Sequence, residues 1–414
     1  MSILVMKFGG TSVANLDRIQ RAAKRVALEV ARGHDVIVIV SAMAGETNKL
    51  VQWVQDTSPL YDAREYDAVT SSGENVTAGL MALRLQEMGI PARSWQGWQV
   101  PVNTTAAHGS ARIDSIPTGN IVRKFDEGMK VAVVAGFQGI SPGGRITTLG
   151  RGGSDTTAVA FAAAFGAIRC DIYTDVDGVY TTDPRICAGA RKLDRIAFEE
   201  MLELASLGAK VLQTRSVELA MRYKVKLRVL SSFEAEGNET AGTLVCPEED
   251  IMESNAVAGV AYSRDEAKVT LTSVADRPGI AAAIFGPLAE AGVNVDMIVQ
   301  NISEHGRTDM TFSCPTDQVL RAEKALAEAR ARGDFAFEDL VVDGGVAKVS
   351  VVGIGMRSHA GVAATMFRAL AAENVNIKVI TTSEIKISVL IDRKYMELAV
   401  QALHDTFGLE KTAA

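Results

Sequence analysis

The densest group of residues that could do chemistry is the sequence TTLGRGGSDTT, which begins at Thr147. Three glycines within four positions allow the backbone to turn sharply and to approach a bound group closely. Main-chain NH groups at the start of a following helix would attract an anion, and Arg151 adds a guanidinium that suits a carboxylate or a phosphate. We expect a helix over residues 156–165, capped by Ser154 or Asp155. The same sequence is also compatible with a turn that binds nothing.

A lysine stands near the end of the first expected strand. Residues 3–8 (ILVMKF) are apolar enough for a buried strand, and GGTS follows them. A helix with an apolar period of about 3.6 residues, capped by Asn15 or Asp17, then leads to an apolar strand at 36–40. This βαβ order puts Lys7 at the carboxyl end of a strand, where open α/β sheets bind ligands. Phosphate binding and a merely solvated lysine are the two interpretations of Lys7.

Further polar loops follow the later strands. The loop 41–48 comes after the second strand and before a helix. Glu74 falls in the first turn of a helix over 75–88, where it could hold a substrate ammonium or simply complement the helix dipole. A strand at 131–135 leads to GFQG, and a strand at 167–174 leads to DVDGVYTTDPR. These loops would meet at one edge of a parallel sheet.

The remaining elements of the first half are a helix over 206–223, which carries Lys210 near its start, and a strand over 225–230. No stretch matches GxxxxGK[ST], and the glycines at 353 and 355 lack the third glycine of a dinucleotide fingerprint. A nucleotide would therefore be bound by another arrangement.

Composition excludes several classes of protein. A length of 414 residues allows two or three domains, and the net charge of −7 argues against a nucleic-acid surface. The apolar runs are too short for a membrane span, and none near the start suits a signal peptide. The four cysteines form no CxxC pair, which predicts neither a zinc site nor disulfides and favours the reducing cytoplasm. We assign none of the five histidines to catalysis.

The last part of the chain contains an internal repeat. Residues 231–255 are rich in Glu, Gly, Asn, Thr and Pro and suggest a domain boundary. Beyond it KVTL at 268 corresponds to KVSV at 348, and VNV at 293 corresponds to VNI at 375. Each copy predicts strand, helix, strand, strand, helix, and two copies side by side would share a sheet and leave ligand pockets at their seam. A purely structural duplication is the alternative.

Taken together, the motifs resemble those of the aspartate kinases of the amino acid kinase family, over essentially the whole chain. The resemblance implies an α/β fold with an open, mostly parallel sheet sandwiched by helices, followed by two α+β ACT domains of the ferredoxin-like βαββαβ type. The implied boundaries are 1–245 for the catalytic domain and 265–342 and 346–414 for the ACT domains. The motifs that carry it are KFGGTS from Lys7, SGE from Ser72, GFQG from Gly136, TLGRGGSD from Thr148 and YTDVDGVY from Tyr173.

The resemblance also implies a reaction. Such enzymes transfer the γ-phosphoryl group of ATP, with Mg²⁺, to the side-chain carboxylate of L-aspartate, in the first step of lysine, threonine and methionine biosynthesis. A carboxylate of pKa near 4 is already ionised at neutral pH, so no general base is needed. By this resemblance the catalytic residues are Lys7, Gly10 and Asp155, with no residue assigned as a metal ligand. The aspartate-binding residues would be Thr47, Glu74, Arg151, Gly152, Gly153 and Ser154, and the ATP-binding residues Lys7, Phe8, Gly9, Gly10, Ser41, Thr174, Asp175, Tyr180, Asp183, Arg185 and Lys210.

The ACT domains imply feedback inhibition by lysine, threonine or both, and a homo-oligomer, either a dimer or a tetramer. A separate regulatory subunit could start at Met252. Alternatives are a non-catalytic amino acid sensor and a related kinase for glutamate, acetylglutamate or uridylate. The candidate effector residues are Asp276, Gly279, Ile280, Asn294, Asp296 and Gln300 in the first copy, and Asn376, Ile377, Ser383 and Glu384 in the second.

Overall fold

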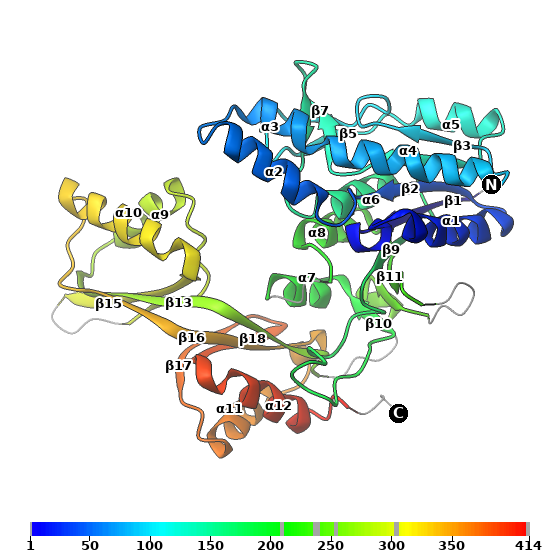
Figure 1. Ribbon diagram of the computed structural model, residues 1–414. Coiled ribbons are helices and arrows are strands. Elements are labelled where there is room, and N and C mark those ends of the chain that lie inside the picture. The colour runs from blue at the N-terminus through cyan, green and yellow to red at the C-terminus, as the bar shows by residue number, and fades with distance from the viewer. Residues whose placement is uncertain (1, 208–210, 235–240, 252–255, 302–305, 411–414) are drawn as a thin grey trace. The chain divides into compact units, whose positions relative to one another are not determined.

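The computed structural model (Figure 1) describes residues 2–207, 211–234, 241–251, 256–301 and 306–410. Lys210 and Met252 lie outside these residues. Two compact units can be distinguished by their internal contacts. The first unit comprises Met1–Val179, Lys192–Ser206 and Lys210–Met252, and the second comprises Tyr180–Arg191, Leu207–Ala209 and Glu253–Ala414.

An eight-stranded sheet forms the centre of the first unit, in the order β10-β12-β11-β9-β1-β2-β6-β3. The six strands from β11 to β3 are parallel, whereas β12 is antiparallel to β11 and β10 is parallel to β12. The expected open, mostly parallel sheet is confirmed. The strands are β1 (Ile3–Phe8), β2 (Asp35–Val40), β3 (Ala92–Trp95), β6 (Val131–Ala135), β9 (Cys170–Thr174), β10 (Arg195–Ala197), β11 (Leu227–Ser231) and β12 (Thr243–Cys246).

Helices cover both faces of this sheet, because its central strands are apolar on both sides. Alternate residues such as Leu4, Met6 and Val38 join a core with apolar side chains of α1 and α4. The helix α6 packs against β1, β2 and β9 and also against α8. The helices of this unit are α1 (Leu16–Ala31), α2 (Glu46–Thr57), α3 (Ala63–Thr70), α4 (Ser72–Glu87), α5 (Gly119–Asp126), α6 (Gly153–Ala164), α7 (Phe198–Ser206) and α8 (Thr214–Tyr223).

A smaller sheet of four strands, in the order β5-β4-β7-β8, completes the first unit. Its strand β8 runs directly into the arginine–glycine turn, and its strand β7 follows β6 after two residues. The small sheet therefore positions the end of the GFQG loop and the start of the arginine–glycine turn. Its strands are β4 (Asn103–Thr104), β5 (Ile113–Ser115), β7 (Gln138–Ile140) and β8 (Ile146–Thr148).

The second unit contains the repeat. Its six strands form one antiparallel sheet in the order β14-β15-β13-β16-β18-β17, so the expected shared sheet is confirmed. Four helices pack on it in two cores, one for each copy. The elements are β13 (Gly259–Ala275), α9 (Ile280–Glu290), β14 (Ile298–Gln300), β15 (Arg307–Pro315), α10 (Val319–Arg332), β16 (Leu340–Val352), α11 (Val362–Ala372), β17 (Ile377–Thr382), β18 (Lys386–Asp392) and α12 (Met396–Thr406).

Two long strands serve both copies. The second half of β13 pairs with β15 and with the first half of β16, from Leu271↔Leu340 onward. The first half of β13 pairs with the second half of β16, from Gly259↔Val352 to Ser263↔Lys348. Each copy is therefore a four-stranded sheet with two helices. The strand segment that completes the sheet of the second copy, Gly259–Ser263, precedes the first copy in the sequence.

Several local expectations need correction. The single helix expected over 206–223 is wrong, because α7 ends at Ser206 and α8 begins at Thr214. The boundary expected over 231–255 contains β12, which pairs with β10 and β11 in the large sheet. By its contacts, Tyr180–Arg191 groups with the second compact unit. The domain limits at 245, 265, 342 and 346 stay predictions.

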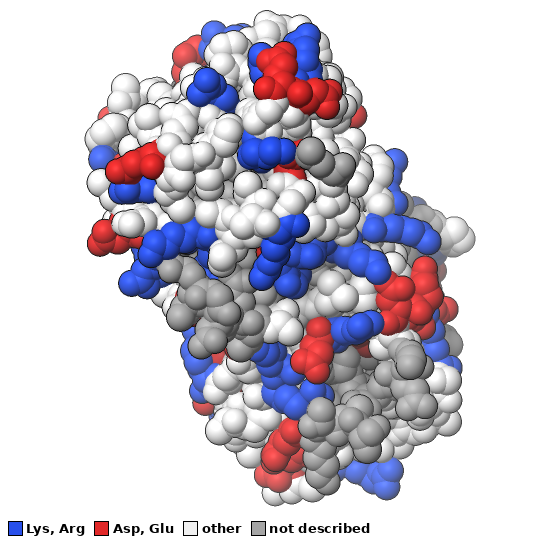
Figure 2. Space-filling model, turned by 90° about the vertical axis from the view of Figure 1, so that its right-hand side faces the viewer, with Lys and Arg blue, Asp and Glu red and all other residues white. Residues whose placement is uncertain are grey.

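The surface carries charges of both signs. On the face drawn in Figure 2, basic and acidic side chains occur in small groups that uncharged surface separates. No helix in the described part of the chain is both long enough and apolar enough to cross a bilayer.

Candidate active site

The ends of three neighbouring strands bring the predicted catalytic residues together. Lys7 pairs with Ile39 across β1 and β2, and Val40 pairs with Ala135 across β2 and β6, so these strands end at the same edge. A cavity of about 340 Å³ opens there. Its walls come from β1 and the following turn, the loop after β2, the starts of α2, α4 and α6, and the loop after β6. The lining residues are Lys7, Gly10, Ser41, Ala42, Met43, Ala44, Gly45, Thr47, Asn48, Glu74, Phe137, Gly150, Arg151, Gly152, Gly153, Ser154 and Asp155.

Lys7 and Asp155 form an ion pair in the lining of this cavity. The Lys7 Nζ atom lies 2.5 Å from the Asp155 Oδ1 atom, and the two side chains are only 10% and 11% exposed. Asp155 lies in the first turn of α6, where the helix dipole favours a negative charge. The pair holds the ammonium in one place within a surrounding that screens charge poorly.

The turn that precedes α6 presents main-chain donors to the cavity. Gly152 is the N-cap in the left-handed region at φ 72°, and a Cβ atom there would lie 2.0 Å from the Gln213 Cγ atom. No side chain caps the helix, so the expectation that Ser154 or Asp155 does so is wrong. Both residues lie inside the first turn. Within the described residues their main-chain NH groups have no hydrogen-bond partner, which leaves two donors for an anion.

Arg151 is exposed and lines the cavity, and no carboxylate of the described chain pairs with it. Because a guanidinium carries five N–H donors in a planar fork, an unpaired arginine at a cavity suits a carboxylate ligand. The position predicted from the sequence is thus accessible to a ligand.

Glu74 is a buried carboxyl group on the same cavity, 3% exposed. Its Oε1 atom accepts a hydrogen bond of 3.1 Å from the main-chain NH of Ala42. Its Oε2 atom is buried and has no hydrogen-bond partner among the described residues. Burial raises the pKa of Glu74 to about 7. A cation beside Oε2 would satisfy this atom and favour the ionised form.

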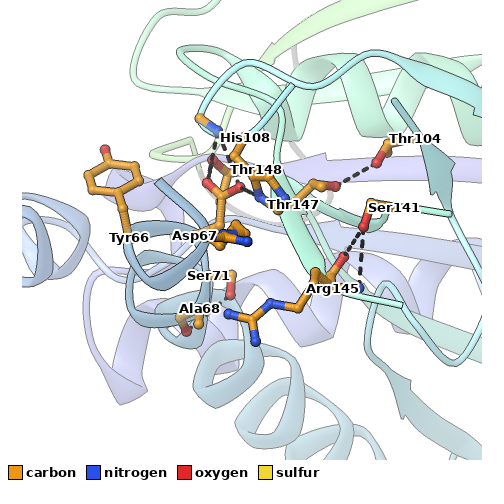
Figure 3. A network of polar contacts seen from close by, with 12 residues as sticks. Tyr66, Asp67, Ala68, Ser71, Thr104, His108, Ser141, Arg145, Thr147 and Thr148 are labelled. Carbon is orange, nitrogen blue, oxygen red and sulfur yellow. Dashed lines mark hydrogen bonds and ion pairs between the residues drawn. The ribbon is translucent and has the colours of Figure 1, made fainter. Parts of the chain in front are cut away.

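A buried aspartate that the sequence did not reveal supports the arginine–glycine turn (Figure 3). Asp67, on α3, is fully buried and accepts hydrogen bonds from the Thr148 hydroxyl at 2.6 Å and from the Gly109 NH at 3.0 Å. His108 Nδ1 lies 2.6 Å from its second oxygen. Thr148 is the last residue of β8, three positions before Arg151. This network fixes the point from which the turn starts.

Phe137 is a second residue that sequence reasoning missed, although the GFQG motif contains it. Its φ of 69° is rare for a bulky residue. The main-chain NH of Phe137 donates to the Thr157 hydroxyl at 3.1 Å, and the Phe137 carbonyl accepts the NH of Leu149 at 2.9 Å. This strained residue therefore connects the loop after β6 to the arginine–glycine turn.

Not every predicted ligand of ATP lines this cavity. The Phe8 side chain is buried in the core and stacks on Tyr173, with 4.8 Å between ring centroids. The Gly9 NH donates to the Tyr173 carbonyl at 3.2 Å, whereas Gly10 lines the cavity. A Cβ atom on Gly10 would lie 3.0 Å from the Ala42 carbonyl oxygen, so the backbone is close-packed there.

The other nucleotide candidates lie elsewhere in the chain. Thr174 and Asp175 follow β9, and the Thr174 hydroxyl donates to Asp175 at 3.1 Å. In the second unit, the Arg185 guanidinium donates twice to Asp183, which also accepts from the Tyr262 hydroxyl at 2.9 Å. Tyr180 lies in the same unit.

The candidate effector residues lie mostly at the surface of the second unit. Ile280 is an exception, because its side chain is in the core of the first copy. Asp296 pairs with Lys348 at 2.5 Å, and Glu384 with Arg357 at 3.4 Å. Gly279 is the left-handed N-cap of α9. The remaining candidates are the exposed Asp276, Asn294, Gln300, Asn376 and Ser383 and the half-buried Ile377.

Comparison with known proteins agrees with this geometry. The profile of the amino acid kinase family matches residues 2–231, and ACT domain profiles match residues 268–331 and 349–407. The aspartate kinase Ask_LysC of Stutzerimonas stutzeri (strain A1501) is 51% identical over 414 residues, which cover 100% of this chain and 99% of that protein. The chain belongs to the aspartate kinases of the amino acid kinase family.

More distant members of this family support the assignment. An aspartokinase of Mycobacterium tuberculosis (strain ATCC 25618 / H37Rv) is 47% identical over 414 residues, covering 99% of this chain and 97% of the relative. The crystal structure of E. coli aspartokinase III in complex with aspartate and ADP has a TM-score of 0.80 at 29% identity. The match covers 98% of this chain and 99% of the aspartokinase III chain. The same enzyme in complex with lysine and aspartate has a TM-score of 0.76.

Proposed function

We propose that this kinase transfers the γ-phosphoryl group of ATP to the side-chain carboxylate of L-aspartate and releases 4-phospho-L-aspartate and ADP. The observation that carries the proposal concerns one cavity. Among the described residues, its Arg151 guanidinium has no carboxylate partner, and a buried carboxyl oxygen of its Glu74 has no hydrogen-bond partner. An α-amino acid has both complementary charges. Its α-carboxylate would bind Arg151, and its α-ammonium would bind Glu74.

The remaining groups of the cavity fit phosphoryl transfer. The acceptor carboxylate is already ionised, so the enzyme must chiefly position two anions and offset their repulsion. Lys7 and the NH of Gly10 would contact the phosphoryl group, and Asp155 holds the lysine in place. The hydroxyls of Thr47 and Ser154 and the backbone of Gly152 and Gly153 would complete the aspartate site.

A magnesium ion would accompany the nucleotide. Mg²⁺ prefers oxygen ligands and binds largely through substrate phosphates and water in such sites. The Asp155 carboxylate is the acidic group beside Lys7, so its second oxygen could contact the ion. When bound, the ion would supply positive charge to the phosphates.

For the nucleotide we propose the main chain around Phe8 and Gly9, together with Ser41, Thr174, Asp175 and Lys210. Tyr180, Asp183 and Arg185, which belong to the second unit, stay candidates by resemblance. For the second unit we propose feedback inhibition by lysine, threonine or both through the effector residues named above. We further propose a cytoplasmic homo-oligomer that catalyses the first step of lysine, threonine and methionine biosynthesis. An effector inhibits only if it binds a less active arrangement more tightly, and typical couplings are about 1–3 kcal/mol.

The test is ADP release with aspartate and MgATP, with the acyl phosphate trapped by hydroxylamine. Arg151→Ala should raise KM for aspartate by about 10²-fold or more, because a charge-assisted bidentate contact is lost, and should leave KM for ATP nearly unchanged. Arg222→Ala, at an exposed position on α8, is the matched control. A rise in KM for ATP instead would assign Arg151 to the nucleotide.

The same assay decides between the alternatives. A non-catalytic sensor would bind aspartate without releasing ADP. A kinase for glutamate, acetylglutamate or uridylate would release ADP with that acceptor in preference to aspartate.

A further inference from the structure

Residues of the second unit bring together three types of side chain that bind transition metals. One ligand atom each of Cys187, His404 and Asp405 lies within 4.8 Å of the others. Cys187 belongs to the segment Tyr180–Arg191, and His404 and Asp405 lie in the last turn of α12. None of the three lines the catalytic cavity. Thiolate, imidazole and carboxylate are the usual protein ligands of Zn²⁺.

His404 is oriented as metal-binding histidines are. Its side chain is fully buried, and its Nε2 atom lies 2.9 Å from the Thr181 Oγ1 atom. Its Nδ1 atom is buried, has no hydrogen-bond partner in the described part of the chain, and lies 3.9 Å from the Asp405 Oδ1 atom. With the proton on Nε2, the lone pair of Nδ1 remains available to a ligand. A ring whose second nitrogen is held by a neighbouring oxygen is typical of metal sites.

The charges around these atoms favour a cation. The carboxylates of Asp405 and Glu410 lie close enough to Cys187 and His404 to act on both electrostatically, and the Arg191 guanidinium also acts on His404. Glu410 provides a further carboxylate near the group.

We propose that Cys187, His404 and Asp405 bind a thiophilic divalent cation such as Zn²⁺, with Glu410 or a water molecule as the fourth ligand. Binding breaks the S–H bond of Cys187, whose proton passes to the buffer, and the thiolate sulfur donates an electron pair to the ion. No electron is transferred. The ion would connect the segment Tyr180–Arg191 to α12, where the Gln401 side chain already donates to the Ile186 carbonyl at 2.7 Å.

Cobalt titration tests the site directly. The full-length protein, freed of metal and without Mg²⁺ or nucleotide, is titrated with Co²⁺ and followed by absorption spectroscopy. We expect about one tightly bound Co²⁺ per chain, a thiolate-to-cobalt charge-transfer band and intense tetrahedral d–d bands, all displaced by Zn²⁺. A folded protein that binds no Co²⁺, or binds it without the thiolate band, overturns the proposal.

Matched variants locate the ligands. Cys187→Ser should abolish the thiolate band, and His404→Gln should weaken Co²⁺ binding at least about tenfold. Cys314→Ser removes another fully buried cysteine of the same unit and should leave the spectrum unchanged. A band that persists in Cys187→Ser, or disappears in Cys314→Ser, contradicts the assignment.

Two measurements remain decisive if a buried variant does not fold. Asp405→Asn changes a side chain that is 65% exposed and should weaken binding without affecting the fold. Calorimetry of Zn²⁺ binding in buffers of different ionisation enthalpy should show about one proton released per ion, because the thiol must ionise. Unchanged affinity in Asp405→Asn, or binding without proton release, contradicts the proposal.

Discussion

At the scale of single residues, Glu74 connects stability to pH. Its pKa of about 7 lies above the value of about 4.3 for an unfolded chain, so the folded protein holds this proton more tightly. The resulting stabilisation is fully present below about pH 4 and is lost as the pH rises through about 7, a change of about 4 kcal/mol. We expect the free energy of unfolding to decrease from about pH 5 to about pH 8 by this contribution.

Denaturant unfolding at several pH values measures this effect. Glu74→Gln should remove the contribution, whereas Glu65→Gln, at an exposed position on α3, should retain it. Saturating aspartate should oppose the decrease, because an ammonium beside Glu74 favours its ionised form. A pH dependence that is identical in wild type and Glu74→Gln would exclude Glu74 as its cause.

Lys7 is the residue on which turnover should depend most. Lys7→Met removes the ammonium next to the transferred group and should lower kcat by about 10²–10³-fold, as loss of a preorganised donor does elsewhere. Circular dichroism should show that the fold persists. Lys324→Met, on an exposed side chain of α10, is the control. Near-normal kcat in Lys7→Met would remove this lysine from the mechanism.

At this scale, residue types and spacing in the sequence are enough to select candidates. Lys7, Arg151 and Asp155 were selected because glycines and charges are close together in the sequence, and all three line one cavity. Asp67 was missed because its partners, at 108, 109 and 148, are distant along the chain. Phe137 was missed because its left-handed backbone depends on contacts with α6 and the arginine–glycine turn.

At the scale of elements, the buried Asp67 connects α3 to the end of β8. Asp67→Ala leaves the Thr148 hydroxyl, the Gly109 NH and His108 without their acceptor. We expect a loss of about 3 kcal/mol in the free energy of unfolding, as for other broken buried networks. The start of the arginine–glycine turn is then less fixed, so KM for aspartate should rise more than KM for ATP.

Glu65→Gln serves as the matched control for Asp67→Ala, because it breaks an exposed ion pair between the same helix and Arg145. Exposed pairs contribute about 0–1 kcal/mol, so little change is expected. Equal effects of the two substitutions, measured by chemical unfolding and steady-state kinetics, would contradict a special role for Asp67.

The elements themselves were predictable to different degrees. Strands β1, β2 and β6 were expected within a residue of their observed limits, because continuous apolar runs are typical of strands buried on both faces. The start of α6 was wrong by three residues, because its cap is a left-handed glycine and not a polar side chain. The break between α7 and α8 was missed because the spacing of apolar residues continues across it without a visible change.

At the scale of the whole molecule, the second unit should behave as one cooperative body. Leu370→Ala creates a cavity in the core of the second copy and should cost about 2–5 kcal/mol. Because β13 and β16 run through both copies, protection from hydrogen exchange should fall at Glu266–Leu271 as well as at Gly259–Ser263. Hydrogen exchange with mass spectrometry measures both segments.

The reciprocal variant is Leu288→Ala, in the core of the first copy. It should lower protection at β18 as well as at β15. Leu204→Ala, in the first unit, should change neither strand. If each cavity affects only its own copy, the two copies are independent despite the shared strands. The repeat in the sequence predicted the common sheet. It did not predict that the segment Gly259–Ser263 completes the sheet of the second copy, because this segment precedes the first copy in the sequence.

The course of β13 limits how the chain can be shortened. A fragment that began at residue 346 would contain α11, α12 and most of the second core, yet it would lack Gly259–Ser263. The outer side of β16 would then have unsatisfied main-chain groups, and an open edge of this kind pairs readily with other chains. Such a truncated product should aggregate. A fragment that began at residue 256 would retain Gly259–Ser263, and this edge of β16 would stay paired.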